Sequence, residues 1–71
     1  MTTRLANRLK VARAEAGLSQ TDLAALAGVT RQTISSIETG QYCPSALLAF
    51  VIADRLGKRI DEVFMMEGDA R

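Results

Sequence analysis

The sequence predicts an all-α fold of five short helices in one domain. Three observations support this prediction. Apolar residues recur three and four positions apart, which is the spacing of one face of an α-helix. A glycine, the residue that most easily ends a helix, follows each of the first four helical segments, at Gly17, Gly28, Gly40 and Gly57. A chain of 71 residues that is 48% apolar can form one compact core and is too short for two.

Composition excludes several classes of protein. The chain has one cysteine, Cys43, and no histidine, so it can form no intramolecular disulfide and offers almost no ligands for a metal site of the Cys and His type. We therefore expect no metal, no cofactor and a reducing, cytoplasmic location. The N-terminus lacks the apolar run of a secretory signal, and no segment approaches the roughly 18 apolar residues of a membrane span. Cys43 is either a small half-buried residue or the site of an intermolecular disulfide.

Charge is distributed unevenly along the chain, although the net charge is only +1. Residues 1–36 contain five basic and two acidic residues, whereas residues 37–71 contain four basic and six acidic ones. This polarity predicts that any anion-binding face lies in the first half of the chain.

The first two helices are predicted at about residues 4–16 and 20–27. The inner face of the first consists of apolar residues at helical spacing: Leu5, Leu9, Ala12 and Ala16. Ser19 followed by Asp22 resembles a capping box, because the hydroxyl can accept an early backbone N–H while the carboxylate favours the positive end of the helix. The second helix therefore starts near Gln20 and ends at Gly28.

Three further helices are predicted at residues 31–38, about 45–56 and 60–64. Thr30 and Ser45 can cap the first two of these. The helix that starts at Ala46 is apolar on nearly all sides. When one of its faces packs in the core, Leu47 and Val51 remain on a second apolar face. Such a surplus face suggests a protein partner. Residues 1–71 would thus form one domain with its core at 5–64, and residues 65–71 would be a tail that could supply a dimerisation strand.

The two short helices at residues 20–38 have the spacing of a helix-turn-helix, in which a tight turn containing glycine joins two helices at a steep angle. Ala24 is small enough for the helices to cross closely, and Ile34 and Ile37 would seat the second helix on the core. Helical bundles with glycine turns are common, so the spacing alone is only moderately specific for DNA binding.

The residues of this motif closely resemble the Cro/CI-type, or Xre-type, DNA-binding domains. The match includes Gly17-Leu18-Ser19-Gln20, Ala27-Gly28-Val29 and the run Arg31-Gln32-Thr33-Ile34-Ser35, and it extends over about residues 5–64. The resemblance implies a five-helix, lambda-repressor-like bundle whose third helix enters the major groove of double-stranded DNA. It also implies that residues 2–5 and 64–67 could form a small antiparallel sheet, as in short stand-alone members of the family.

The resemblance assigns DNA contacts to polar residues around the helix-turn-helix. Gln20 matches a phosphate-clamping position, although it could be an ordinary exposed residue. Arg31 and Gln32 are the strongest candidates for reading bases, because a guanidinium can bond guanine and a carboxamide can bond adenine; Arg31 could instead contact a phosphate. The other candidates are Thr30, Thr33, Ser35, Ser36, Thr39, Gln41 and Tyr42. The two serines could simply be solvated, and the tyrosine could pack as a lid on the fourth helix.

Two further predictions concern structure and assembly. The resemblance implies a partly buried ion pair between Arg13 and Glu38, which would tie the first helix to the end of the third. The surplus apolar residues predict a homodimer, which would bind an inverted-repeat operator. Its interface is assigned to Leu47, Val51, Phe64, Met65 and Met66.

The function expected from these features is that of a sequence-specific, DNA-binding transcriptional regulator, most simply a repressor that acts as a homodimer. Two alternatives stay open. The chain could be an antitoxin that also binds DNA and covers a toxin with its apolar surface, or a helical protein-interaction adaptor without DNA binding. An enzyme is disfavoured because the chain has no histidine, no plausible activated nucleophile and no phosphate-binding loop of the G-x-x-x-x-G-K type.

Overall fold

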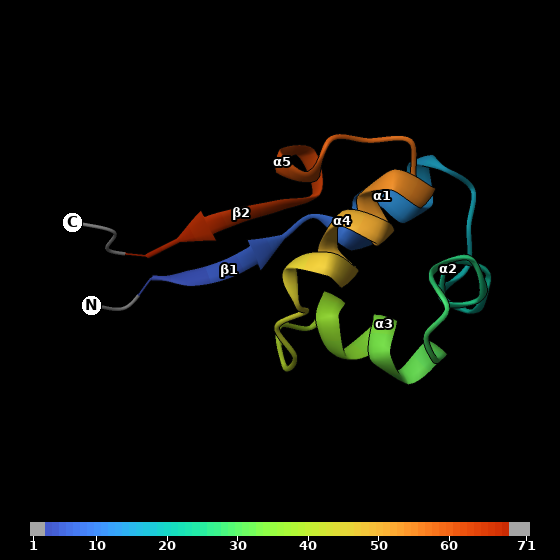
Figure 1. Ribbon diagram of the computed structural model, residues 1–71, viewed down its shortest axis with the longest axis horizontal. Helices are drawn as coiled ribbons and strands as arrows, with labels where there is room; N and C mark the ends of the chain where they lie inside the picture. The colour runs from blue at the N-terminus through green and yellow to red at the C-terminus, as the bar shows by residue number, and fades with distance from the viewer. Residues whose placement is uncertain (1–2, 69–71) are drawn as a thin grey trace.

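The computed structural model describes residues 3–68, which fold into five helices and a two-stranded antiparallel sheet (Figure 1). The helices are α1 (Leu9–Glu15), α2 (Gln20–Ala27), α3 (Arg31–Glu38), α4 (Ala46–Arg55) and α5 (Ile60–Val63). The strands are β1 (Arg4–Asn7) and β2 (Phe64–Glu67). The predicted fold class, a five-helix bundle with a small β extension, is confirmed. Within residues 3–68 none of the helices has the length and apolarity needed to cross a membrane.

All five helices contribute to one shared core. The largest fully buried side chains are Leu9, Leu23, Ile34, Ile37, Ile52 and Val63. Helices of seven or eight residues are marginally stable alone, so α1, α2 and α3 depend on this core for their persistence. In Figure 1 the two strands extend from the bundle as a ribbon, whereas α3 lies along the bottom of the view and α2 beside it. The core therefore fixes α2 and α3 as a pair on a side of the bundle that the ribbon does not cover.

The start of the chain differs from the prediction. The first helix was expected from residue 4 but begins at Leu9, and Arg4–Asn7 form β1 instead, with Leu5 opposite Met66 and Asn7 opposite Phe64. Asn7 supplies the local reason for the break: its Oδ1 accepts the Leu9 N–H at 3.1 Å, and its Nδ2 donates to the Ile37 carbonyl at 2.9 Å. The chain therefore turns at Asn7, and Leu5 is left 37% exposed on the ribbon.

The N-terminal strand of the ribbon also differs from the expectation in its bounds. The N-terminal strand was expected at residues 2–5 and lies at Arg4–Asn7, while its partner lies at Phe64–Glu67 as expected. Residue 2 of the expected strand and residues 69–71 of the expected tail lie outside the described residues. The remaining helix ends agree with the prediction to within about one residue.

The turn between α2 and α3 is built from Gly28, Val29 and Thr30. Gly28 has φ of +73°, and an added Cβ would meet no atom within 4 Å, so glycine is required by the backbone conformation and not by close packing. Thr30 Oγ1 accepts the Thr33 N–H at 3.2 Å and so caps α3. The caps predicted at Ser19 and Ser45 are formed as well, to the N–H groups of Asp22 and Leu48. Side-chain caps therefore mark the starts of α2, α3 and α4.

Candidate nucleic-acid interface

The first turn of α3 presents the two residues predicted to read bases. Arg31 and Gln32 are both exposed, and Gln32 Nε2 donates to Ser36 Oγ at 3.4 Å one turn further along. The first turn of α3 contains no acidic residue. The first backbone N–H groups of a helix have no acceptor within the helix, and they carry the positive end of its dipole. The N-terminus of α3 can therefore attract an anion while its side chains reach outward.

Thr30 and Thr33 contact each other at the start of α3. In addition to the cap, in which Thr30 Oγ1 accepts the Thr33 N–H, the two hydroxyl oxygens lie 3.0 Å apart. Thr30 is exposed and Thr33 is half-buried. A hydroxyl can donate one hydrogen bond and accept two, so each threonine keeps some capacity for a further partner.

The second group of predicted contacts lies at the end of α3 and in the loop that follows. Ser35 and Ser36 are half-buried, whereas Thr39, Gln41 and Tyr42 are exposed. The Gln41 and Tyr42 N–H groups both donate to the Ser36 carbonyl, at 2.9 and 3.1 Å, and Thr39 Oγ1 donates to the same carbonyl at 3.2 Å. The loop therefore folds back against the end of α3. The Tyr42 residue is 46% exposed, so part of its surface is open to a further partner.

Gln20, the first residue of α2, faces α3. Its Nε2 donates to Glu38 Oε1 at 3.0 Å, and its Oε1 accepts from Arg31 Nη1 at 3.3 Å. One amide hydrogen stays free for another acceptor. Gln20 is half-buried, so it is not an ordinary exposed residue, and its predicted role as a phosphate clamp stays a prediction. The sequence does not predict these two contacts, because they join side chains of different helices.

The Arg13–Glu38 ion pair lies behind this surface. Arg13 Nε donates to Glu38 Oε2 at 2.7 Å, and Arg13 Nη1 donates to the Leu18 carbonyl at 2.9 Å. The two side chains are only 15% and 5% exposed. The pair therefore joins α1, the segment before α2 and the end of α3.

Comparison with known proteins fits this geometry. The family model for helix-turn-helix proteins, HTH_3, matches residues 9–63, which run from the start of α1 to the end of α5. The chain belongs to this helix-turn-helix family. The Cro/CI-type resemblance seen in the sequence is thereby confirmed. The family and the relatives below belong to a non-enzymatic class, in agreement with the expectation that the chain is not an enzyme.

Relatives of this helix-turn-helix protein occur in archaea and bacteria. An uncharacterized HTH-type transcriptional regulator of Methanocaldococcus jannaschii is 51% identical over 63 residues, covering 89% of this chain and 96% of the relative. The HTH-type transcriptional regulator YgzD of Bacillus subtilis, also uncharacterized, is 44% identical over 61 residues, covering 86% and 92%. A crystal structure of a proposed DNA-binding protein from Bacteroides fragilis superposes with a TM-score of 0.80 at 26% identity, covering 87% of this chain and 100% of that one.

The residues expected at a dimer interface fall into exposed and buried groups in this helix-turn-helix protein. Leu47 on α4 and Met66 on β2 are 74% and 75% exposed, whereas Val51 and Met65 are half-buried. Phe64 is only 5% exposed and packs in the core of its own chain, contrary to the expectation that it faces a partner. Its place at the first position of β2 turns its side chain inward.

Phe50 is an exposed apolar residue that the sequence does not place at the interface. It is 59% exposed and lies three residues after Leu47 and one before Val51, so the three share one face of α4. We call Leu47, Phe50 and Val51 the α4 apolar face. The spacing from Leu47 places Phe50 on this face, but the nearly continuous apolar run of α4 does not show which of its residues are exposed.

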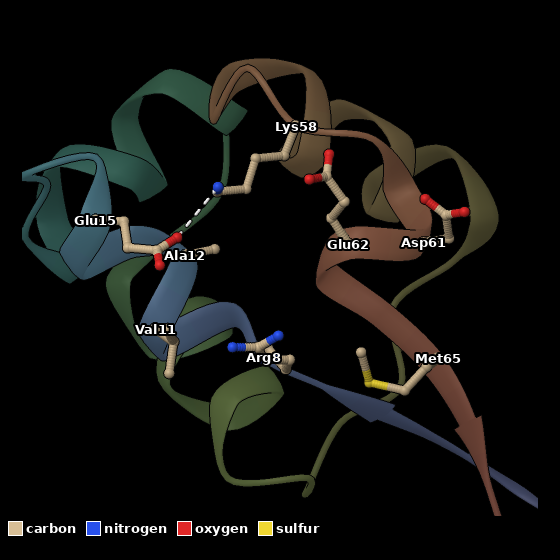
Figure 2. Close-up of a pocket in the computed structure, with 8 residues that line it drawn as sticks. All are labelled: Arg8, Val11, Ala12, Glu15, Lys58, Asp61, Glu62 and Met65. Carbon is tan, nitrogen blue, oxygen red and sulfur yellow. Dashed lines mark ion pairs between the residues drawn. The ribbon is translucent and has the colours of Figure 1, made fainter.

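A pocket of about 290 Å³ lies on another part of the helix-turn-helix protein, between α1, α5 and β2 (Figure 2). Figure 2 shows Lys58 extending toward Glu15, with Lys58 Nζ 3.1 Å from Glu15 Oε1. The pocket is lined by Arg8, Val11, Ala12, Glu15, Lys58, Asp61, Glu62 and Met65. None of these residues belongs to α2 or α3. The pocket is therefore separate from the surface built by the helix-turn-helix.

Residues 3–68 contain no group of three or more His, Cys, Asp or Glu side chains placed to hold a metal ion.

Proposed function

We propose that this protein is a sequence-specific transcriptional regulator that binds double-stranded DNA through α3. The observation that carries the proposal is the first turn of α3, which exposes Arg31 and Gln32 at a helix N-terminus without an acidic residue. The names of the archaeal and bacterial relatives, which describe transcriptional regulators, support it. So does the structural likeness to the protein from Bacteroides fragilis.

In this proposal α3 lies in the major groove. Arg31 bonds guanine O6 and N7, and Gln32 bonds adenine N6 and N7, because the side chains of these two types match those base edges. Backbone N–H groups at the start of α3, together with the side chains around it, hold phosphates. These side chains are Gln20, Thr30, Thr33, Ser35, Ser36, Thr39, Gln41 and Tyr42. Such contacts need little net positive charge, which explains how a chain of net charge +1 can hold a polyanion.

Selection of bound duplexes from a random DNA pool tests this function. The wild-type protein is expected to enrich a specific sequence. Arg31→Ala and Gln32→Ala are each expected to relax the preference at their own base pair, because a bidentate contact contributes about 1–3 kcal/mol of discrimination. Ser45→Ala, which alters the cap of α4 and does not change a proposed contact residue, is the control and should retain the wild-type preferences. Enrichment of no sequence at moderate salt would contradict the proposal and favour an adaptor.

We further propose that the protein binds its operator as a homodimer and acts as a repressor in the cytoplasm. The α4 apolar face, with Met65 and Met66 on β2, is assigned to the interface with a second copy, because large apolar side chains at this exposure favour burial against a partner. A twofold dimer would present two copies of α3 to an inverted repeat whose half-sites lie about 34 Å, or a multiple of that, apart. Repression is the simplest mode of action because a bound protein blocks a promoter by occupying it.

Leu47→Glu is expected to weaken the dimer at least about 10-fold, because it places a charge in the proposed apolar contact. Sedimentation equilibrium at tens of micromolar measures the change, and circular dichroism verifies the fold of the variant. Leu26→Glu is the matched control, since Leu26 is also exposed, at 48%, but lies on α2. A wild-type protein that sediments as a monomer with and without DNA would contradict the homodimer. In that case a toxin gene next to this gene would favour the antitoxin role, with the α4 apolar face covering the toxin.

A further inference from the structure

We propose that Arg4, at the outer end of β1, bonds a DNA phosphate beside the loop at residues 39–42 that follows α3. The ribbon of β1 and β2 thereby becomes a second element of the DNA interface. This inference rests on the proposed function, and it adds to that interface a cation from outside α2, α3 and the loop.

The edge of β1 lies beside the end of α3. Figure 1 shows β1 as the lower of the two strands, on the side of α3. A hollow of about 380 Å³ is lined by Arg4 and Glu67 of the ribbon together with Thr39 and Gly40 at the end of α3. A second hollow is lined by Arg4, Gly40 and Tyr42, among others. Arg4 therefore borders the loop in both hollows.

The loop has no positive charge of its own. Between Arg31 and Arg55 the sequence contains no lysine and no arginine. The last turn of α3 contains no basic residue, and the C-terminal end of a helix carries the negative end of its dipole. Among the described residues that line the two hollows, Arg4 alone is basic. A phosphate at this loop can therefore be neutralised by Arg4 and by no residue of the loop.

The Arg4 guanidinium is accessible and incompletely bonded. Its side chain is 76% exposed, and its Nε and Nη2 both donate to the same atom, Glu67 Oε1, at 3.0 and 2.9 Å. A guanidinium has five N–H donors, so three stay free within the described residues. Phosphate oxygens match the fork of these donors, and an exposed ion pair contributes little to stability. A phosphate can therefore replace Glu67 at small cost.

Glu67 is the carboxylate that competes with the phosphate for Arg4. The other carboxylate in the first hollow, that of Glu38, is 5% exposed and accepts from Arg13 Nε at 2.7 Å. Glu38 is thus already neutralised inside the protein. The Glu67 side chain is 55% exposed, so it can turn into solvent when DNA binds.

Arg4→Gln tests the phosphate contact because it removes the charge and keeps a polar side chain. With the selected operator, we expect the affinity to fall about 3- to 10-fold near 0.1 M salt, and the slope of log affinity against log salt to become shallower by about 0.9 per bound chain. The base preferences should not change, because a phosphate contact carries no sequence information.

Arg59→Gln is the matched control. Arg59 is 79% exposed and pairs with Asp61 at 2.9 Å, so the substitution makes the same change of charge at an equally exposed ion pair. Arg59 precedes α5, which Figure 1 shows on the opposite side of the bundle from α3. Its charge is screened from the DNA over a Debye length of about 8 Å at physiological salt, so affinity and salt slope should stay at the wild-type values.

Glu67→Gln separates a phosphate contact from a purely structural ion pair. Arg4→Gln and Glu67→Gln each break the same pair, so a structural role predicts that both change DNA affinity in the same direction. We expect opposite directions: Glu67→Gln should tighten binding, because it removes the carboxylate that competes for Arg4. Circular dichroism and sedimentation verify that both variants keep the fold and the oligomeric state, since Glu67 follows Met66 of the proposed dimer interface.

Neutral methylphosphonates, placed one at a time along the selected duplex, locate the contact. The wild-type protein should lose affinity at the phosphate that Arg4 bonds, and Arg4→Gln should show no further loss there while the penalties at other phosphates persist. Unchanged affinity in Arg4→Gln, equal losses in Arg4→Gln and Arg59→Gln, or a methylphosphonate profile that Arg4→Gln does not alter would overturn the ribbon contact while the proposed function stands. A wild-type protein that selects no duplex would instead overturn the proposed function and the ribbon contact with it.

Discussion

Replacing Glu38 with leucine should lower the free energy of unfolding by about 3–5 kcal/mol, because the substitution leaves a buried charge without a partner. The Arg13 side chain is only 15% exposed and would lose both bonds to the carboxylate. Urea denaturation followed by circular dichroism measures the change. A domain of this size loses about 4–8 °C of melting temperature per kcal/mol, so the melting temperature should fall by more than about 10 °C.

Two further variants separate the buried pair from ion pairs in general. Arg13→Met combined with Glu38→Leu removes both charges and should recover much of the stability, because neither charge is then buried alone. Arg4→Met removes one partner of the exposed Arg4–Glu67 pair, whose side chains are 76% and 55% exposed, and should cost only about 0–1 kcal/mol. Unchanged melting temperatures in both Arg13→Met and Glu38→Leu would show that the buried pair does not stabilise the fold.

Ile34→Ala should destabilise the protein by about 2–5 kcal/mol, since it removes buried methyl and methylene groups and leaves a cavity under α3. Ile34 is 0% exposed and is one of two isoleucines that seat α3 on the core. The same denaturation experiment measures this effect. DNA affinity should fall as well, because the recognition surface of α3 is positioned by that packing.

Leu26→Ala is the control for this substitution. Leu26 is 48% exposed, so its truncation should change the unfolding free energy by no more than about 0.5 kcal/mol. Ile34→Val, which removes a single methylene, should cost about 0.5–1.5 kcal/mol. An Ile34→Ala variant as stable as Leu26→Ala would mean that α3 does not depend on the core as described.

The helix-turn-helix could be predicted closely from sequence because its signals are local. Ser19 and Thr30 start α2 and α3 by accepting N–H groups three residues ahead, and Gly28 ends α2 through a left-handed backbone. Each of these acts within a few residues. The residues proposed to contact DNA follow from the same boundaries, since the helical period then determines which side chains point outward.

Features that depend on partners far away in the sequence could be predicted less closely than the helix-turn-helix. Leu5 and Leu9 have helical spacing, but Leu5 belongs to a strand whose partner is Met66, more than sixty residues away. On α4, apolar residues surround nearly the whole helix, so the pattern did not reveal that Phe50 is exposed. The contact of Gln20 with Glu38 and Arg31 needs the crossing of α2 and α3, which no local pattern contains.

The most direct test of the central claim, that α3 reads DNA, is a nuclear magnetic resonance titration of the ¹⁵N-labelled protein with the selected duplex. The account predicts that the largest backbone shifts occur at residues 19–22, 30–36 and 39–42, and that the α4 apolar face shifts little. Shifts concentrated at Leu47, Phe50 and Val51, with none at Arg31 and Gln32, would contradict it.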